Sequence, residues 1–529
     1  MRTPSAGVIA GLFIALTMSA CAKPTVKPVA VMPPGPTPTE RLSEADRLVR
    51  AGCLDCLLDA YRSYQSLRAI PSAANAATLG AIRAAGLLAL RERELGMVDE
   101  GYVAAAKQLV AGTPGLPVWI GGTLDIVDAL GGSIAGISRP PSSDVELDRM
   151  RVRRQNGAAF VALLRDFSEV DELAAYTWVS FMCGGYEARD AIQLTPAEIF
   201  AAVSTFRDTP LIVFAQATCR AIDGPKLTAI AAAEPRFTET AYLLGLRELG
   251  RRKLDEAEAD FDRAYAWRPR WPALTLALGN IAMTGEEFEK AERMYSETIS
   301  SDPRSADGVL GEVKALTYLG KAVEAIAATD RLLGERWHVG DARYWRALNE
   351  NQLSRYEEAW DDVEKAAKLL INAEVPKLAG IIAYRRVQLD IALAKFIESQ
   401  QRNPLDCETA FYHGIVLGDL RQWGLTANVL RETVSCVEAA EQDAREDIAA
   451  IRVSADPPER QARQIARREQ RIAEGRRMIA TSWYNTAVAY FSLANKEAAR
   501  QFAEKVAADE QYGDRAREIL ARLGKSPQP

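Results

Sequence analysis

Histidine is scarce in this chain of 529 residues, which contains only His338 and His413. Two histidines give few options for general-base catalysis or for a metal site. The sequence also lacks nucleophile-elbow, kinase-type and metal-ligand signatures. Carboxylates are numerous, but pairs such as Asp361 and Asp362 have the spacing of solvated helix faces. We therefore expect no catalytic residues, no bound metal and no cofactor, although acid–base pairs assembled across distant helices stay open.

An excess of charge of one sign is also missing. Lys and Arg number 65 against 71 Asp and Glu, which gives a formal net charge of −6. Such a balance provides no electrostatic footprint for nucleic acid, so we expect no nucleic-acid partner. Long apolar runs are absent too, because the longest, Gly7 to Met18, is too short to span a bilayer as a stable helix.

What the chain does contain is an internal repeat. Ala257, Ala291, Ala325 and Ala359 lie 34 residues apart, each at the same place in a helix-turn-helix pattern. A fixed period of this length indicates stacked pairs of α-helices, here called helix A and helix B of each copy. Small residues allow the two backbones to approach where helix A crosses helix B. A proline near the end of a copy ends helix B, since it lacks a donor N–H.

Seven copies follow each other with decreasing regularity. They are marked by Leu244, Gly245, Phe261, Ala264 and Pro269; by Leu278, Gly279, Tyr295 and Pro303; by Val313; by Ala347 and Ala366; by Gly380, Ala392, Phe396 and Pro404; by Gly414, Trp423 and Leu430; and by Trp483, Ala487, Tyr490 and Ala499. The pattern resembles the tetratricopeptide repeat (TPR) over roughly residues 238–436 and 480–512. The resemblance implies an all-α, right-handed α-solenoid that binds protein partners along a groove.

The groove of such a solenoid is lined by its A helices, which gives a set of candidate partner-binding residues. A lysine and an asparagine one turn apart grip a carboxylate in some TPR proteins, but here Leu276 precedes Asn280, so that clamp is absent. A groove containing Tyr, Leu and Phe suits an extended or helical peptide. The alternative is that several of these side chains only pack helix A against its neighbour. The candidates are Tyr242, Leu246, Leu276, Asn280, Leu310, Lys314, Tyr344, Leu348, Phe411, Ile415 and Tyr484.

The N-terminus has the features of an export signal. Arg2 precedes the apolar stretch, which ends in Met18-Ser19-Ala20-Cys21. Small residues before a cysteine resemble a bacterial lipobox, which implies cleavage before Cys21 and lipids on that cysteine. The alternative is an ordinary secretory signal cut near Ala20. The resemblance predicts a lipid-anchored protein of the bacterial cell envelope.

The residues after Cys21 support the lipoprotein interpretation. Six prolines fall between Ala22 and Thr39, and such a stretch forms an extended, semi-rigid tether between a membrane and a folded body. Ala22 rather than Asp follows the cysteine, which suggests sorting to the outer membrane, facing the periplasm.

Six further cysteines fall into three neighbouring pairs, which fits export. The pairs are Cys53 with Cys56, Cys183 with Cys219, and Cys407 with Cys436. Cys407 is expected to begin helix A of the sixth copy and Cys436 to end its helix B, so antiparallel helices bring them together. Cys53 and Cys56 also have the spacing of a redox pair, but no βαβ pattern surrounds them, and a structural disulfide is preferred. A zinc site is not expected.

These observations divide the chain into six parts: a signal peptide (1–20), a tether (21–40), a divergent helical region (41–235), the TPR array (236–436), a charged helical insertion (437–478), and a last copy with a capping helix (479–525). The insertion is arginine-rich beyond Pro457-Pro458. It is interpreted as a solvated helix or a helical extension, with a docking surface for an acidic partner as the alternative. The glycine run at 131–136 lacks the Gly-Lys-Ser/Thr ending of a phosphate loop and is interpreted as a loop.

Three functions remain open. The first is a membrane-anchored scaffold that binds envelope proteins or peptide segments through its groove. The second is a ligand-binding lipoprotein that partners an envelope transporter, although 7% aromatic residues do not mark a glycan-capture surface. The third, a hydrolase within residues 71–235, has the least support. A polar pocket in the N-terminal half would favour the second and third, and an open groove the first.

Overall fold

The computed structural model describes residues 36–130, 133–134, 137–138, 144–183, 194–219, 221–454 and 456–524. The predicted all-α solenoid is confirmed within these residues: helices α1 to α25 dominate, and the short strands β1 (Ser133–Ile134) and β2 (Ile137–Ser138) pair antiparallel. In the described part of the chain, no helix combines the length and apolarity that a membrane span needs. The signal peptide, Cys21 and most of the tether lie outside the described residues.

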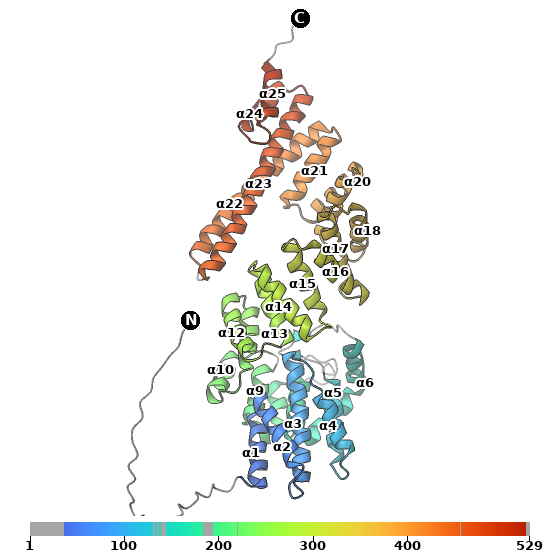
Figure 1. The fold of residues 1–529 in the computed structure, drawn as a ribbon, viewed down its shortest axis with the longest axis vertical. Helices are drawn as coiled ribbons and strands as arrows, with labels where there is room; N and C mark the ends of the chain where they lie inside the picture. The colour runs from blue at the N-terminus through green and yellow to red at the C-terminus, as the bar shows by residue number, and fades with distance from the viewer. Residues whose placement is uncertain are drawn as a thin grey trace, which may run out of the picture.

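The N-terminal region is a compact group of helices at one end of the molecule (Figure 1). Its core continues into the first two copies of the array, because buried residues from Ala45 to Met294 form one contiguous cluster. The N-terminal region therefore packs on the array. Its helices are α1 (Pro38–Ala51), α2 (Leu54–Leu67), α3 (Ala74–Leu95), α4 (Tyr102–Ala111), α5 (Val118–Ala129), α6 (Asp144–Phe167), α7 (Glu172–Cys183), α8 (Pro196–Ala201), α9 (Pro210–Thr218) and α10 (Gly224–Ala233), with a 3-10 turn at Ser204–Phe206.

The array follows as helix pairs in the register that the repeat predicts. Helix B ends two residues before each of Pro269 and Pro303. The A helices of copies one to six are α11 (Thr240–Gly250), α13 (Pro272–Thr284), α15 (Ala306–Tyr318), α17 (Val339–Gln352), α19 (Glu374–Arg385) and α21 (Cys407–Asp419). The B helices of copies one to five are α12 (Leu254–Trp267), α14 (Phe288–Ser301), α16 (Ala322–Gly334), α18 (Tyr356–Ala367) and α20 (Leu389–Arg402).

Glycine and an aromatic ring fit together inside the hairpins. A Cβ atom added to Gly245 would lie 2.5 Å from the ring of Phe261, and one added to Gly380 would lie 2.6 Å from Phe396. Tyr295 contacts Gly279 of its own hairpin and also Gly311 of the next copy, where added Cβ atoms would lie 2.7 and 2.4 Å from its ring. The ring of Tyr295 thus contacts two copies. In the third copy, which lacks glycine at the usual position, Gly311 provides the small residue that this ring requires.

The array is curved with its A helices on the inside. Each A helix from α13 to α21 packs against the next A helix, whereas successive B helices within residues 236–454 do not pack together in this way. Elements at the smaller radius of an arc lie closer to each other, so the A helices line its inner face. Figure 1 shows the arc from α13 to α21, with α18 and α20 on its outer side.

The charged residues 437–478 are the projecting ends of two repeat helices, in agreement with a helical extension. Helix α22 (Trp423–Arg452) is helix B of the sixth copy, and α23 (Pro458–Ser492) contains helix A of the seventh. Cys436 therefore does not end helix B as predicted, because no helix-breaking residue follows it before Pro457. Helices α24 (Lys496–Lys505) and α25 (Gly513–Gly524) complete the chain.

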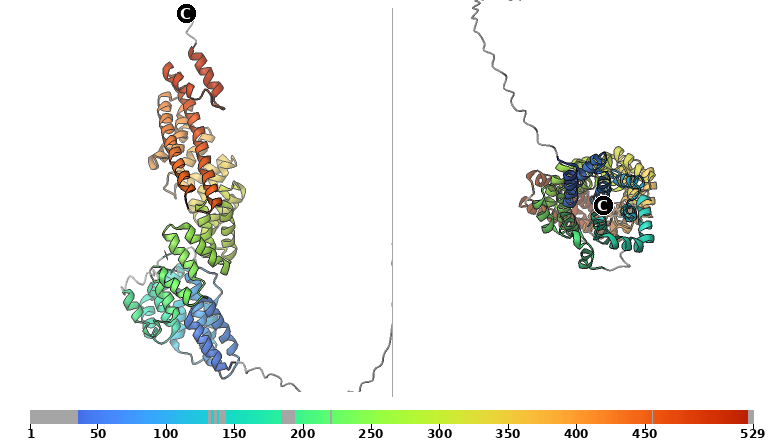
Figure 2. Two further views of the ribbon diagram at one scale, coloured as in Figure 1. Left: turned by 90° about the vertical axis from the view of Figure 1, so that its left-hand side faces the viewer. Right: turned by 90° about the horizontal axis from the view of Figure 1, so that it is seen from below.

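We call residues 437–478 the arm. Its two helices lie side by side and return from the sixth copy toward α12 and α14, across the open side of the arc (Figure 1). The left view of Figure 2 shows the arm in front of the middle of the array. The array and the arm together therefore form a closed loop.

Candidate functional site

Aromatic side chains follow one another along the inner face of the array. Tyr318, on α15, packs edge-on against Trp345 of α17 with ring centroids 6.1 Å apart, and Trp345 contacts Tyr344 at 5.5 Å. Phe411 and Tyr412 form a similar pair on α21, 5.5 Å apart. All five are half-buried or exposed, so each keeps apolar surface available to a partner.

Polar groups accompany these rings on α19 and α21. The Tyr384 hydroxyl donates to Asp419 at 3.0 Å, and burial together with this carboxylate raises the pKa of Tyr384 to about 12. Nζ of Lys377 lies 2.8 to 3.4 Å from carboxylate oxygens of Glu374, Asp406 and Glu408. Burial works to lower the pKa of Lys377, but these carboxylates outweigh it and raise that pKa. The inner face is thus mixed in character, with fixed charges between apolar rings.

The predicted groove residues divide into two groups. Tyr344, Leu348, Phe411, Ile415 and Lys314 are half-buried on A helices of the middle of the array, where a partner can reach them. Leu246 packs against the core of the N-terminal region, and Tyr484 stacks on Tyr512 at 4.8 Å. Asn280 is exposed and accepts a hydrogen bond from the Tyr295 hydroxyl at 2.8 Å.

Tyr242 and Leu310 were wrong as groove residues. Tyr242 is 2% exposed because it packs on Phe261 and on Trp271, whose indole donates to the Leu95 carbonyl. Tyr242 is thus enclosed by side chains of the first two copies, and the N-terminal region holds Trp271 in place through the Leu95 carbonyl. Leu310 is buried among apolar residues of the third and fourth copies. Leu276 lines a cavity of about 310 Å³ between the N-terminal region and the second copy.

Sequence reasoning missed four inner-face aromatics. The sequence does contain a signal for these four residues. Tyr344, Lys377 and Phe411 occupy the same position in successive copies of the repeat, and the four missed aromatics lie at neighbouring positions of helix A. Extending the repeat register to every inner position of helix A would have found them. The missed aromatics are Tyr318, Trp345, Tyr384 and Tyr412.

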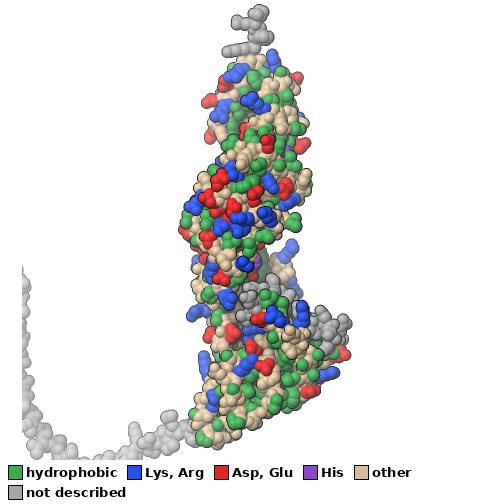
Figure 3. Space-filling view, turned by 90° about the vertical axis from the view of Figure 1, so that its right-hand side faces the viewer, with side chains coloured by type: hydrophobic (Ala, Val, Ile, Leu, Met, Phe, Trp, Pro, Cys, Tyr) green, Lys and Arg blue, Asp and Glu red, His purple; other side chains and the backbone are tan. Residues whose placement is uncertain are grey.

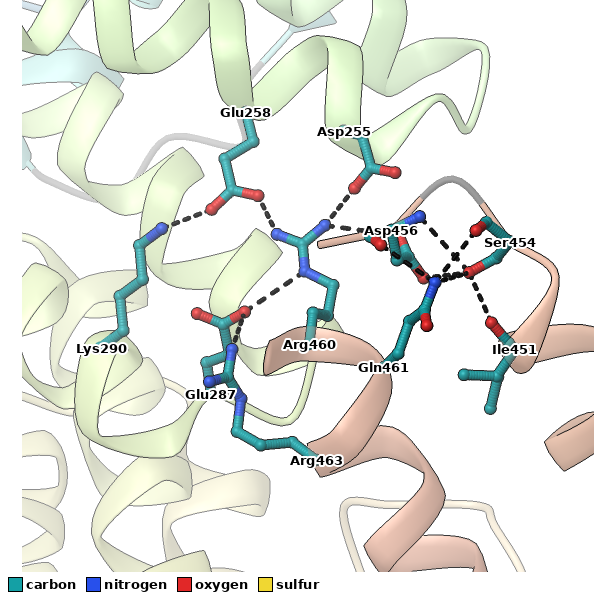
Figure 4. Close-up of polar contacts among 10 residues, drawn as sticks. All are labelled: Asp255, Glu258, Glu287, Lys290, Ile451, Ser454, Asp456, Arg460, Gln461 and Arg463. Atoms are coloured by element: carbon teal, nitrogen blue, oxygen red, sulfur yellow. Dashed lines mark hydrogen bonds and ion pairs between the residues drawn. The ribbon is translucent and has the colours of Figure 1, made fainter. Parts of the chain in front are cut away.

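The tip of the arm contacts the first two copies through arginines (Figure 4). The guanidinium of Arg460, which is only 9% exposed, contacts carboxylates of Asp255 and Glu258 on α12 and lies 3.3 Å from Glu287, at the start of α14. Arg463 reaches the same Glu287 oxygen at 2.8 Å. Residues more than 170 positions apart in the chain are joined here.

The next turns of α23 extend this contact. Arg468 and Arg471 lie 3.6 and 3.3 Å from one oxygen of Glu286, in the turn before α14. Arg467 contacts the other oxygen of Glu286 and covers the ring of Phe288 at 4.9 Å. Phe288 in turn stacks on Tyr318 at 4.7 Å. The arm tip therefore adjoins one end of the aromatic row on the inner face.

The carboxylates under the arm tip respond differently to it. Burial acts to raise the pKa of Glu258, but Lys290 and Arg460 outweigh burial and lower it. Burial and a hydrogen bond with Asp456 of the arm raise the pKa of Asp255. The arm thus brings a carboxyl group as well as arginines to this contact.

The three predicted disulfides, Cys53–Cys56, Cys183–Cys219 and Cys407–Cys436, are joined in the structure. Cys53 and Cys56 are completely buried, and an inaccessible pair does not fit a thiol-exchange site. In the residues described, no three or more His, Cys, Asp or Glu side chains gather where a metal ion would be held. His338, the residue before α17, lies beside Asp307, and His413, on α21, lies beside Gln400.

The N-terminal region has a surface cavity of about 510 Å³ between α1, α9 and α10. Its floor is apolar, with Ala51, Val213 and Ile230 among its lining residues. The cations at its rim already have partners: Arg50 pairs with Glu172, and Lys226 with Asp223. This cavity is the candidate site for the alternative function of ligand binding.

Charge does not single out a binding surface. On the face drawn in Figure 3, acidic and basic side chains are interspersed, and neither sign forms a continuous stripe. A single-signed patch is the usual footprint of nucleic-acid binding. Six arginines of α23 are engaged by carboxylates of the same chain, which accounts for much of the most basic segment of the sequence: Arg460, Arg463, Arg467, Arg468, Arg471 and Arg476.

Comparisons with known proteins give the following. No known family's sequence profile matches the chain, and none of the curated proteins matches it. Three solved structures of similar architecture are a TPR protein of Thermus thermophilus, a TPR protein of Parabacteroides merdae, and the APC/C hetero-tetramer Cut9–Hcn1. Their sequence identities are 17%, 15% and 12%, and they cover 34%, 54% and 92% of this chain and 98%, 99% and 98% of their own.

The TM-scores of these three structures are 0.29, 0.33 and 0.39. Scores this low carry no argument about function. The description of the array as TPR-like rests on its own helix pairs, on the 34-residue register, and on the contacts between glycine and aromatic rings such as Gly245 with Phe261.

Proposed function

We propose that this protein is a scaffold of the bacterial cell envelope, anchored by lipids on Cys21, that binds an extended segment of a partner protein along its inner face. The observation that carries the proposal is the row of accessible aromatic side chains on α15, α17 and α21. Aromatic side chains provide large apolar contact area at low entropic cost, and fixed charges between them orient a peptide backbone.

A site-specific test uses a photo-crosslinking amino acid at Tyr344 or Phe411 in the membrane-bound protein. We expect the same partner to be captured from both positions and not from Val323, an exposed residue on α16 at the outer side of the array. Tyr318→Ala and Phe411→Ala should then weaken binding of the purified partner, each by more than about 1 kcal/mol. Equal capture from Val323 would contradict an inner-face site.

The lipid anchor has its own test. Cys21→Ser should move the protein from the membrane fraction to the soluble fraction and abolish incorporation of labelled palmitate. If the wild-type protein is exported and cleaved but is never acylated, the segment is an ordinary secretory signal.

The second candidate function is ligand binding by the N-terminal region. The cavity beside Val213 and Ile230 offers it a place, although its floor is apolar and not the polar pocket that was expected to favour ligand binding. Native mass spectrometry of the protein purified from its envelope would detect a bound small molecule, and Ala229→Trp, which fills the cavity mouth, should remove it. If the purified protein carries no small molecule and still captures its partner, the ligand-binding function is wrong and the scaffold function stands.

A further inference from the structure

The contact between the arm and the first two copies is made by long charged side chains. Arg460, Arg463, Arg467, Arg468 and Arg471 provide it on the arm, and four carboxylates receive it. Within the described residues, no apolar cluster joins 437–478 to α12 or α14, and α23 is not closely packed on either helix. Arg463, Arg467 and Arg471 are 41 to 66% exposed, and ion pairs of such side chains are screened by salt and are far weaker than a packed interface. Arg460 is the buried member of the contact, and salt screens its ion pairs less.

The base of the arm is fixed much more firmly. The Cys407–Cys436 disulfide ties α22 to the start of α21 at the residue where the arm begins. Val434, Val437 and Ile479 form a small buried cluster beside it. The arm itself is a stable unit, since α22 and α23 pack along their length and Glu441 pairs with Arg476 across them. The arm is thus a rigid helical hairpin that is fixed to the array at its base and is held only by ion pairs at its tip.

We propose that the arm is a latch over the inner face of the array. In the closed state, the arginines of its tip rest on Asp255, Glu258, Glu286 and Glu287, and the arm crosses the open side of the arc. In the open state, these ion pairs are broken, and the inner face is accessible from the side. Because α22 and α23 run unbroken through the base, the movement is a bend of both helices beside Cys436 and Gly475, where a glycine lets α23 bend.

The latch limits the kind of partner that the inner face accepts, a consequence that rests on the proposed function. A folded domain cannot enter a closed loop from the side. A flexible chain segment either threads through or enters while the arm is open, and closure then surrounds it. The chemistry that fits is an extended, unfolded segment with apolar side chains for the rings of Tyr318 and Phe411.

The movement can be measured without any partner. Nitroxide labels at Val453→Cys, at the end of α22, and Glu289→Cys, on α14, report the distance between arm tip and array by pulsed electron resonance in a Cys21→Ser chain. We expect one short distance in low salt and a second, longer population in 1 M NaCl, because screening at about 1 M shortens the electrostatic range to roughly 3 Å. The Arg460→Glu/Arg463→Glu variant should show the long population already in low salt.

A matched control is Arg477→Glu, which reverses the charge of an exposed arginine on the same helix that has no ion pair among the described residues. It should leave the distance unchanged. If the wild-type distance stays single and short in high salt, and the double reversal does not lengthen it, the arm is a fixed strut and the proposal is wrong. Circular dichroism verifies folding, and the wild-type salt series decides the matter if the double variant does not fold.

Accessibility of the inner face gives a second readout. The rate at which a bulky maleimide modifies Tyr344→Cys should rise about tenfold in the double-reversal background, as expected when about 1.4 kcal/mol of ion pairing is lost. Modification of Val323→Cys on the outer side should not change. Equal rates at Tyr344→Cys in both backgrounds would show that the arm does not cover the inner face. If the arm opens in these experiments but crosslinking captures no partner, the proposed scaffold function is wrong and the proposed movement of the arm still holds.

Discussion

Cys407 and Cys436 are joined by a disulfide, with Cα atoms 5.6 Å apart, at the point where α22 leaves the array and becomes the arm. The bond closes the hairpin of the sixth copy. It lies beside the buried cluster of Val434, Val437 and Ile479, where α22 changes from the packed array to the projecting arm.

Removal of this disulfide should loosen the sixth copy and the base of the arm. In the Cys407→Ser/Cys436→Ser variant we expect a local loss of about 3 kcal/mol, since the bond closes a loop of 29 residues. Hydrogen exchange should rise in α21 and α22 and stay unchanged in α13 and α14. Uniform loss of protection through the whole array would contradict a local role.

The ring of Tyr295 is held between Gly279 and Gly311 and cannot move away from one without meeting the other. Gly311→Ala should therefore destabilise the protein by about 1–3 kcal/mol through overpacking. Gly334→Ala is the control, because nothing lies within 4 Å of its added Cβ, and it should stabilise by up to about 1 kcal/mol. Thermal unfolding of the two variants measures the difference. A stabilising Gly311→Ala would show that Tyr295 adapts freely.

The turn between helix A and helix B requires a positive φ, at the same repeat position in successive copies. Gly320 has it in the third copy, whereas Val387 has it in the fifth with φ 61°. A β-branched residue is strained there, so Val387→Gly should stabilise by about 1 kcal/mol.

Val323 is the matched control for this change, since it is an exposed valine with helical backbone in the first turn of α16. Val323→Gly should destabilise by about 0.3 kcal/mol. Chemical denaturation of both variants gives the comparison. Destabilisation by Val387→Gly would mean that the turn does not strain valine.

Glu92 should make stability depend on pH. It is 3% exposed, and burial raises its pKa to about 8 from an ordinary value of 4.5. The folded state then keeps a proton that the unfolded state releases, so the contribution of Glu92 is full below pH 4.5 and is lost as pH rises toward 8.

The Glu92→Gln variant should lose this part of the dependence. The free energy of unfolding of the wild type, relative to the variant, should fall between pH 5 and pH 8 by a few kcal/mol, at about 1.4 kcal/mol for each unit of pKa shift. Denaturant melts across this range measure it. A constant difference, or one that grows with pH, would show that Glu92 is ionised in the folded protein.

The local pattern of the sequence was sufficient to predict the array. Because each copy repeats the same contacts, the helix crossing at Gly245 and Ala257 could be predicted from spacing alone, and so could the pairing of Cys407 with Cys436. The contact of Phe261 with Gly245 of its own hairpin was not predicted. The loss of Tyr242 from the inner face could not be predicted, because it depends on Trp271 reaching the Leu95 carbonyl in a region without a repeat.

The docking of the arm was equally hidden. Arg460 and Asp255 are both polar residues on amphipathic helices, and nothing in their spacing distinguishes a charge that meets water from one that meets a distant carboxylate. The arginine-rich segment looked like a solvated helix or a surface for an acidic partner. Its acidic partner is a surface of the same chain.

The bridge made by Arg460 also has a mechanical consequence. A curved stack of helix pairs lengthens under tension by small rotations at each interface, as a spring does. Here a pull on α25 relative to α11 must first break the contacts of Arg460 with Asp255 and Glu258 before the copies between them straighten. We therefore expect the array to resist stretching while the Arg460 contacts hold, and to lengthen only under a force that breaks them. The ionic strength of the surroundings changes the size of that force.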